Sequence, residues 1–60
     1  MPKEMIKDFI NKKVSITVFN SAFAVTGILV ASEGNWIKIE TKRDFEIINV
    51  DHIQSMVIAK

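Results

Sequence analysis

The chain begins with apolar residues at helical spacing and then alternates between apolar and polar positions. A proline at position 2 and an acidic residue two positions later suit the N-terminus of a helix. The apolar residues on one side of this first segment are Met5, Ile6, Phe9 and Ile10. Their spacing predicts a short α-helix over residues 1–11, which must pack on another element to be stable.

At residue 14 the pattern changes to a period of two, which is typical of β-strands with one buried face. Clusters of Asn, Ser, Gly, Asp and Lys interrupt the pattern and predict turns between the strands. Gly27 lies inside the second strand, where a glycine indicates a bend, a bulge or a close approach of two backbones. The predicted strands cover residues 14–19, 23–31, 36–40, 45–50 and 55–59.

Five short strands joined by tight turns predict an all-β fold. A strongly bent five-stranded antiparallel barrel of the SH3 type would close this meander and hide its edge strands. The composition agrees, because Ile and Val number sixteen against a single leucine, and β-branched residues fit a pleated surface. We therefore expect one domain over residues 1–60, with the helix at 1–11 and the barrel at 14–59.

A chain of 60 residues is short for a stable core. A domain of this size buries only about 60% of the surface that its unfolded chain exposes. Without cysteine there is no disulfide to add stability, so association with other chains is expected. The fourth and fifth strands carry apolar residues on both faces, which predicts that they contact a neighbouring subunit. The candidate interface residues are Ile48, Val50, Met56, Val57 and Ile58.

The charge and composition of the chain argue against several classes of function. Eight basic and seven acidic residues give a net charge of +1, which produces no long-range field for a polyanion. No apolar run reaches the roughly 20 residues of a membrane span, and no signal peptide is present, so a cytoplasmic protein without membrane contact is expected. One histidine and no cysteine exclude the common metal sites. No catalytic motif is present, so we expect no enzyme activity, no cofactor and no small-molecule substrate.

A few fixed positions accompany the hydrophobic pattern. Leu29 follows Gly27 by two residues, Glu33 follows it by six, and Ile53 comes after the short turn that ends the fourth strand. With the order of elements, these positions resemble the two sequence blocks of the Sm-like family, which includes the Sm and LSm proteins and bacterial Hfq. The resemblance covers about residues 5–58. Its segments are Val14-x-Ile16-x-Val18, Gly27-x-Leu29, Trp36-Ile37 and Val50-Asp51-His52-Ile53.

The resemblance implies a homo-oligomeric ring, a hexamer or a heptamer, in which the fourth strand of one subunit pairs with the fifth strand of the next. It also implies a scaffold or chaperone that binds single-stranded RNA without catalysis. Where Sm-type members bind uridine with an aromatic or polar residue, an asparagine and an arginine, this chain has Asn35, Ile37 and Asn49. Phe19 resembles the aromatic residue on which Hfq stacks adenines, and the Lys12-Lys13 pair resembles the basic patch on its rim.

Phe19 and the basic candidates each have a simpler alternative role. Phe19 either stacks on bases or packs against a neighbouring residue. The basic residues either contact phosphates or lie in solvated loops. The candidate RNA-binding residues are Phe19, Asn35, Lys12, Lys13, Lys42, Arg43 and His52.

Three further side chains have expected roles within the fold. Trp36 points away from the core and is expected to pack under the helix or at a subunit contact rather than to be exposed for binding. Lys38 can pair with a glutamate across the sheet, and Asp51 is expected to cap a turn. The alternative to an RNA-binding ring is a structural or protein-interaction oligomer that has kept the fold and lost RNA binding.

Overall fold

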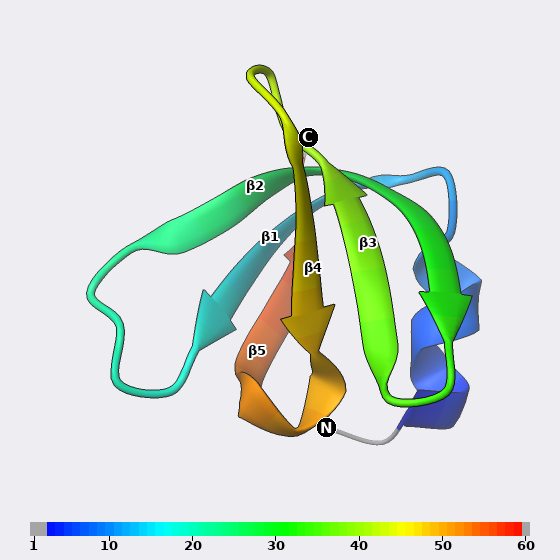
Figure 1. Cartoon of the computed structure of the whole chain (residues 1–60), viewed down its shortest axis with the longest axis horizontal. Helices are drawn as coiled ribbons and strands as arrows, with labels where there is room; N and C mark the ends of the chain where they lie inside the picture. Colours follow the sequence, from blue (N-terminus) through cyan, green and yellow to red (C-terminus); the bar gives the residue numbers. More distant parts are fainter. Residues whose placement is uncertain (1–2, 60) are drawn as a thin grey trace.

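The computed structural model of the chain describes residues 3–59, which form five antiparallel strands and two short 3-10 helices (Figure 1). The elements are η1 (Lys3–Phe9), β1 (Lys13–Val18), β2 (Ala24–Glu33), β3 (Trp36–Glu40), β4 (Phe45–Asn49), η2 (Val50–His52) and β5 (Ile53–Ile58). The all-β prediction is confirmed.

The predicted α-helix is wrong in type, because the first element is a 3-10 helix over Lys3–Phe9. A 3-10 helix repeats every three residues, so Ile6 and Phe9 lie on the same side; Ile6 is part of the core and the partly buried Phe9 packs against it. Met5, which an α-helical stripe would have included, is 52% exposed. Residues 1 and 2 of the predicted helix lie outside the described part of the chain.

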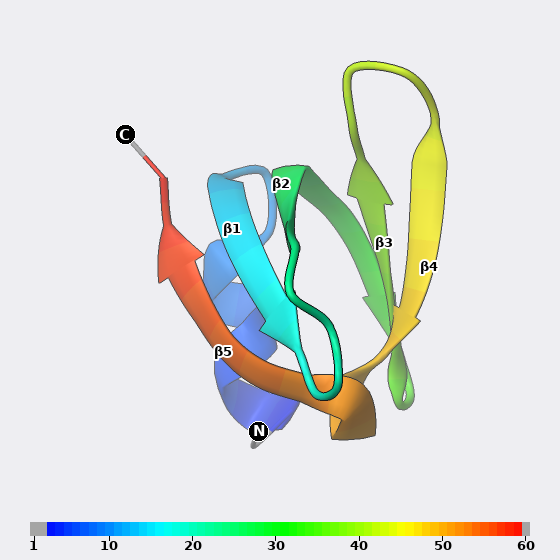
Figure 2. The same cartoon turned by 90° about the vertical axis from the view of Figure 1, so that its left-hand side faces the viewer.

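The strands form one sheet in the order β4-β3-β2-β1-β5. The predicted closed barrel is wrong, because the ladder of hydrogen-bonded strands ends at β4 on one side and at β5 on the other. Figure 2 shows these two edge strands joined through η2 at one end and standing well apart at the other. The sheet is therefore strongly curved and open.

Gly27 lies on β2 beside the C-terminal end of β3, next to the pair formed by Ile28 and Glu40. A Cβ atom at this position would overlap the backbone carbonyl oxygen of Glu40 and would lie 2.8 Å from Cγ2 of Ile39. Two residues further along, the pairing of β2 with β3 shifts register between Leu29 and Ala31, as in a β-bulge. The close backbone approach that the sequence suggested for Gly27 is confirmed, and it accompanies the curvature of β2.

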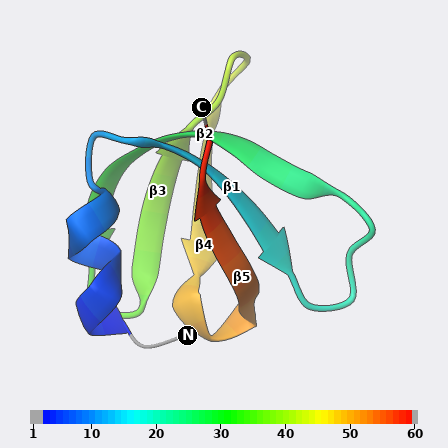
Figure 3. The same ribbon diagram turned by 180° about the vertical axis from the view of Figure 1, so that it is seen from behind.

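All five strands and both 3-10 helices contribute buried side chains to a single apolar core. The backbone after η1 is fastened to β2, because the N–H of Asn11 donates to the carbonyl of Leu29 at 2.7 Å. Figure 3 shows η1 at one side of the sheet, beyond β3. The core residues are Ile6, Val14, Ile16, Leu29, Ile37, Ile39, Ile48, Val50, Ile53 and Met56.

The core contains three of the five residues that were expected at a subunit interface. Ile48, Val50 and Met56 are at least nine-tenths buried within one chain, so their side chains pack mainly in the core of the subunit itself, and their place at a subunit interface stays a prediction. The two apolar faces of β4 are occupied differently, because Ile48 points into the core while its neighbour Ile47 is 59% exposed. Val57 and Ile58 on β5 are more than half exposed.

Candidate nucleic-acid interface

Three connecting segments meet at one end of the sheet, around η2. The N–H of Phe19, just after β1, donates to the carbonyl of His52 at 2.8 Å. The N–H of Val50 donates to the carbonyl of Asn35, in the β2–β3 turn, at 2.7 Å. These bonds hold the β1–β2 segment, the β2–β3 turn and η2 together, although up to about 30 residues separate them in the sequence.

The residue that caps the turn at η2 is Asn49 and not Asp51. The side-chain oxygen of Asn49 accepts a hydrogen bond from the N–H of Asp51 at 2.8 Å, so Asn49 caps η2. The carboxylate of Asp51 instead accepts from Nδ2 of Asn35 at 3.0 Å. The prediction that Asp51 caps the turn is therefore wrong. Its negative charge is directed to the β2–β3 turn.

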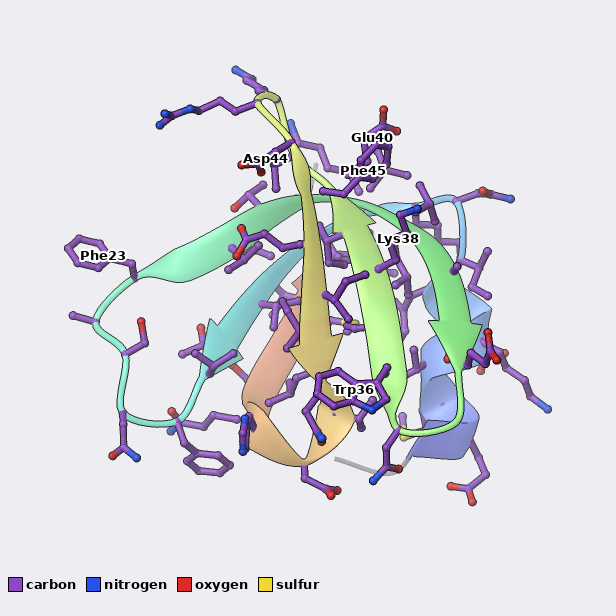
Figure 4. The ribbon with its side chains drawn as sticks, in the orientation of Figure 1. Phe23, Trp36, Lys38, Glu40, Asp44 and Phe45 are labelled. Atoms are coloured by element: carbon purple, nitrogen blue, oxygen red, sulfur yellow. The ribbon has the colours of Figure 1, made fainter. Side chains whose placement is uncertain are left out.

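Beside this junction lies a groove of about 330 Å³. Two exposed aromatic residues line it, Phe19 at 56% and Trp36 at 51% exposure. Figure 4 shows the indole of Trp36 on the outside of the sheet, at the start of β3 and near η2. Trp36 is therefore not packed under η1, whereas its packing at a subunit contact stays a prediction. The other polar residues that line the groove are Asn20, Asn49 and His52.

This lining matches the chemistry of a planar heterocycle. Aromatic side chains offer apolar faces on which a base can stack, and such stacking stabilises binding by about 1–3 kcal/mol per base. The asparagine amides and the imidazole of His52 supply both hydrogen-bond donors and acceptors at the same place. No lysine, arginine, aspartate or glutamate is among the lining residues of this groove. Binding here would depend on stacking and neutral hydrogen bonds.

The predicted basic residues lie elsewhere. Lys13, Lys42 and Arg43 line a separate hollow of about 640 Å³ at the opposite end of the strands. Lys12 is not among the residues that line either hollow, and its backbone carbonyl accepts from the N–H of Leu29 at 3.1 Å. Asn35 is half-buried and bonded to Asp51 at the edge of the junction. Of the seven candidates, the structure brings only Phe19 and His52 together in the groove.

Lys38 on the outer surface of β3 contacts an aromatic ring. Its Nζ lies 4.5 Å from the centroid of the Phe45 ring, on the neighbouring strand β4 (Figure 4). This cation–π contact takes the place of the expected pairing with a glutamate. The lysine side chain lies over one part of the Phe45 ring, and Phe45 as a whole is still 54% exposed.

Three aromatic or polar residues of the groove were not among the binding residues predicted from the sequence, namely Asn20, Trp36 and Asn49. The alternation around Trp36 gave its direction, away from Ile37 and Ile39, but not whether another element covered it. Asn49 carries no signal of its own, because its position beside Phe19 depends on the hydrogen bonds that join η2 to the β1–β2 segment.

No helix formed by residues 3–59 combines the length and apolar composition needed to cross a membrane. Among the same residues, no group of three or more His, Asp or Glu side chains is placed to hold a metal ion. Comparison of the chain with protein-family models, with curated proteins and with solved structures finds no match.

Proposed function

We propose that this chain is the subunit of an Sm-like homo-oligomeric ring that binds single-stranded RNA as a scaffold or chaperone, without catalysis. The ring part of the proposal rests on the two open edges of the sheet. The RNA-binding part rests on the groove lined by Phe19 and Trp36, which is the single observation that carries it.

The ring proposal is supported by which strands are left unpaired. The sheet order leaves β4 and β5 at the edges, and these are the strands that the resemblance to Sm-like proteins would pair between subunits. Unpaired edge strands present free N–H and C=O groups to another chain. Both edges also carry exposed apolar side chains, namely Phe45 and Ile47 on β4 and Val57 and Ile58 on β5.

The RNA proposal is supported by the composition of the groove. Duplex nucleic acid hides its bases in a stack, whereas single-stranded RNA presents unstacked bases to aromatic side chains. Phe19 and Trp36 offer two such side chains within one groove, beside amides and an imidazole that can bond to base edges. A ring would repeat the groove in every subunit, so several weak contacts on one RNA strand would act together.

The test is a titration of the protein with fluorescently labelled oligo-A and oligo-U, followed by anisotropy. We expect micromolar or tighter binding to at least one of them, and a loss of about tenfold in affinity for each of Phe19→Leu and Trp36→Leu. Phe23→Leu is the matched control, because Phe23 is 81% exposed and lies outside the groove. Binding that all three variants retain equally would overturn the assignment of the groove.

A second readout uses Trp36 itself, which is the one tryptophan in the chain. A base stacked on its indole should quench the intrinsic fluorescence in proportion to the bound fraction. The Phe19→Leu variant keeps this reporter, so its weaker affinity should appear as a shifted quenching curve. An unchanged emission spectrum at saturating RNA would place the RNA elsewhere.

The second candidate function is a ring that binds proteins instead of RNA. It is favoured by Phe23, which protrudes from the β1–β2 connection (Figure 4) in a turn held by Ser21, whose Oγ lies 3.2 Å from the N–H of Phe23. The net charge of +1 also suits a protein surface better than a polyanion. The same titration separates the two functions, since an intact oligomer without affinity for either RNA would favour the protein-binding ring.

A further inference from the structure

The hollow of about 640 Å³ gathers basic side chains from distant parts of the sequence. Lys13 comes from the start of β1, whereas Lys42 and Arg43 come from the tip of the β3–β4 hairpin. All three residues are exposed. Gly27 belongs to the floor of this hollow, where the absence of a side chain lets β2 and β3 come close together.

Charge is unevenly divided between this hollow and the rest of the chain. Three of the eight basic residues and one of the seven acidic residues, Glu40, line the hollow, which gives it a formal charge of +2. The remaining five basic and six acidic residues leave the rest of the chain at −1. The small net charge of the chain therefore includes a locally positive hollow, while Arg43 also adjoins Asp44 and Glu46 on its other side.

The hairpin tip that carries two of the three cations has a defined turn. The N–H of Thr41 donates to the carbonyl of Asp44 at 2.8 Å, and the hydroxyl of Thr41 accepts from the N–H of Asp44 at 3.1 Å. The same hydroxyl lies 2.9 Å from Oδ1 of Asp44. These contacts hold the acidic residue against the base of the turn and leave Lys42 and Arg43 at its tip.

The hollow and the aromatic groove lie at opposite ends of the sheet. The groove contains Trp36 from the start of β3, and the hollow contains Glu40 from its end. A strand of five residues spans about 17 Å, so one ligand that fills both must be a chain of several linked units. A flexible chain of planar bases joined by phosphates meets this requirement.

We propose that the hollow lined by Lys13, Lys42 and Arg43 binds the backbone phosphates of the RNA strand whose bases stack in the groove. This proposal rests on the proposed function. The groove supplies contacts to bases and the hollow supplies contacts to phosphates, which position a nucleic acid without reading its sequence. Glu40 weakens the hollow by repelling the same phosphates.

The experiment measures the affinity for a labelled single-stranded oligo-A, long enough to span the sheet, over a series of salt concentrations. Each phosphate contact contributes about 0.7 to the slope of log K against log salt for single strands. We therefore expect the salt dependence to become shallower by about that amount in each of three variants, namely Lys13→Gln, Lys42→Gln and Arg43→Gln. Lys7→Gln removes the same charge from exposed η1 and should leave the slope unchanged.

A gain of affinity provides a stricter test than a loss. Glu40→Gln removes the one carboxylate that lines the hollow, so the affinity for the long oligonucleotide should rise severalfold at low salt. Glu4→Gln, on exposed η1, is its control and should have a smaller effect. For a dinucleotide, which is too short to span the sheet, none of these charge variants should matter, whereas Phe19→Leu should still weaken binding.

The two proposals fail in different ways. If the wild-type protein binds neither oligo-A nor oligo-U, the proposed function is overturned and the phosphate site with it. If Phe19→Leu weakens binding but the triple variant of Lys13, Lys42 and Arg43 keeps the wild-type salt slope, only the phosphate site is overturned. Far-UV circular dichroism of every variant checks that the fold is retained, as expected for exposed positions.

Discussion

Replacing Gly27 with alanine tests the close approach of β2 to the end of β3. The added Cβ would overlap the carbonyl oxygen of Glu40 and lie 2.8 Å from Cγ2 of Ile39. The oxygen belongs to the backbone of a paired strand, and Ile39 is fully buried, so neither can move aside freely. The two strands must separate, and overpacking of this kind destabilises a core by about 1–3 kcal/mol.

An opposing effect is smaller. Alanine restricts the unfolded chain more than glycine does, which stabilises a protein by about 0.4–1 kcal/mol where the native backbone accepts it. The expected net loss at Gly27 is therefore roughly 1–2 kcal/mol. A core of this size rarely supplies more than about 3–5 kcal/mol, so the loss removes a large share of the stability of the fold.

The assay is urea unfolding followed by the fluorescence of Trp36, at one fixed protein concentration because oligomers are stabilised by mass action. The midpoint of Gly27→Ala should fall clearly below that of the wild type. Gly34→Asn is the matched control, because Gly34 has φ +57° and open space around it, and asparagine tolerates this conformation. A Gly27→Ala protein that is as stable as the wild type would refute the close approach of the two strands at Gly27.

The remaining predictions concern single contacts. Ile39→Ala leaves a cavity in the core and should lower the free energy of unfolding by about 2–5 kcal/mol, enough for circular dichroism to detect unfolded chain without denaturant. Asn49→Ala removes the cap of η2 and should reduce stability by about 0.5–2 kcal/mol in thermal melts, whereas Asn49→Ser should restore most of it; equal melts would contradict the cap. Asn11 has φ 70°, so Asn11→Val should cost about 1–2 kcal/mol in urea unfolding while Asn11→Gly is tolerated; a stable Asn11→Val protein would contradict this backbone assignment.

Strands β1, β2 and β3 could be predicted from the sequence because buried residues alternate with less buried ones along them. The buried residues of β5, Ile53 and Met56, are three positions apart, and the predicted strand at 55–59 missed its first two residues. The pairs Ile37 and Ile39 on β3 and Val14 and Ile16 on β1 are all buried, as their spacing indicates. The alternation gives the direction of a side chain relative to its own strand only. It could not show that the sheet stays open, because closure depends on whether β4 and β5 come within hydrogen-bonding distance.

The candidate site was predictable only in part, because local alternation does not show which distant segments come together. The exposed Phe19 follows from its place at the end of an alternating strand, but its partners come from the hydrogen bonds between its N–H and His52 and between Val50 and Asn35. Lys13 and Lys42 were both among the basic candidates, but nothing in the sequence placed them next to each other. Their common hollow arises because antiparallel pairing brings the β3–β4 hairpin to the start of β1, a contact between segments about 30 residues apart.

The number of subunits in solution tests the ring most directly. Native mass spectrometry of the 6.8 kDa chain should show a hexamer or a heptamer. Val57 is 58% exposed, so Val57→Asp should dissociate the ring into folded single chains by placing a charge at the contact, whereas Gln54→Asp, exposed on the same strand, should leave the ring intact. A wild-type protein that is monomeric at micromolar concentration would contradict the proposal that β4 and β5 join neighbouring subunits.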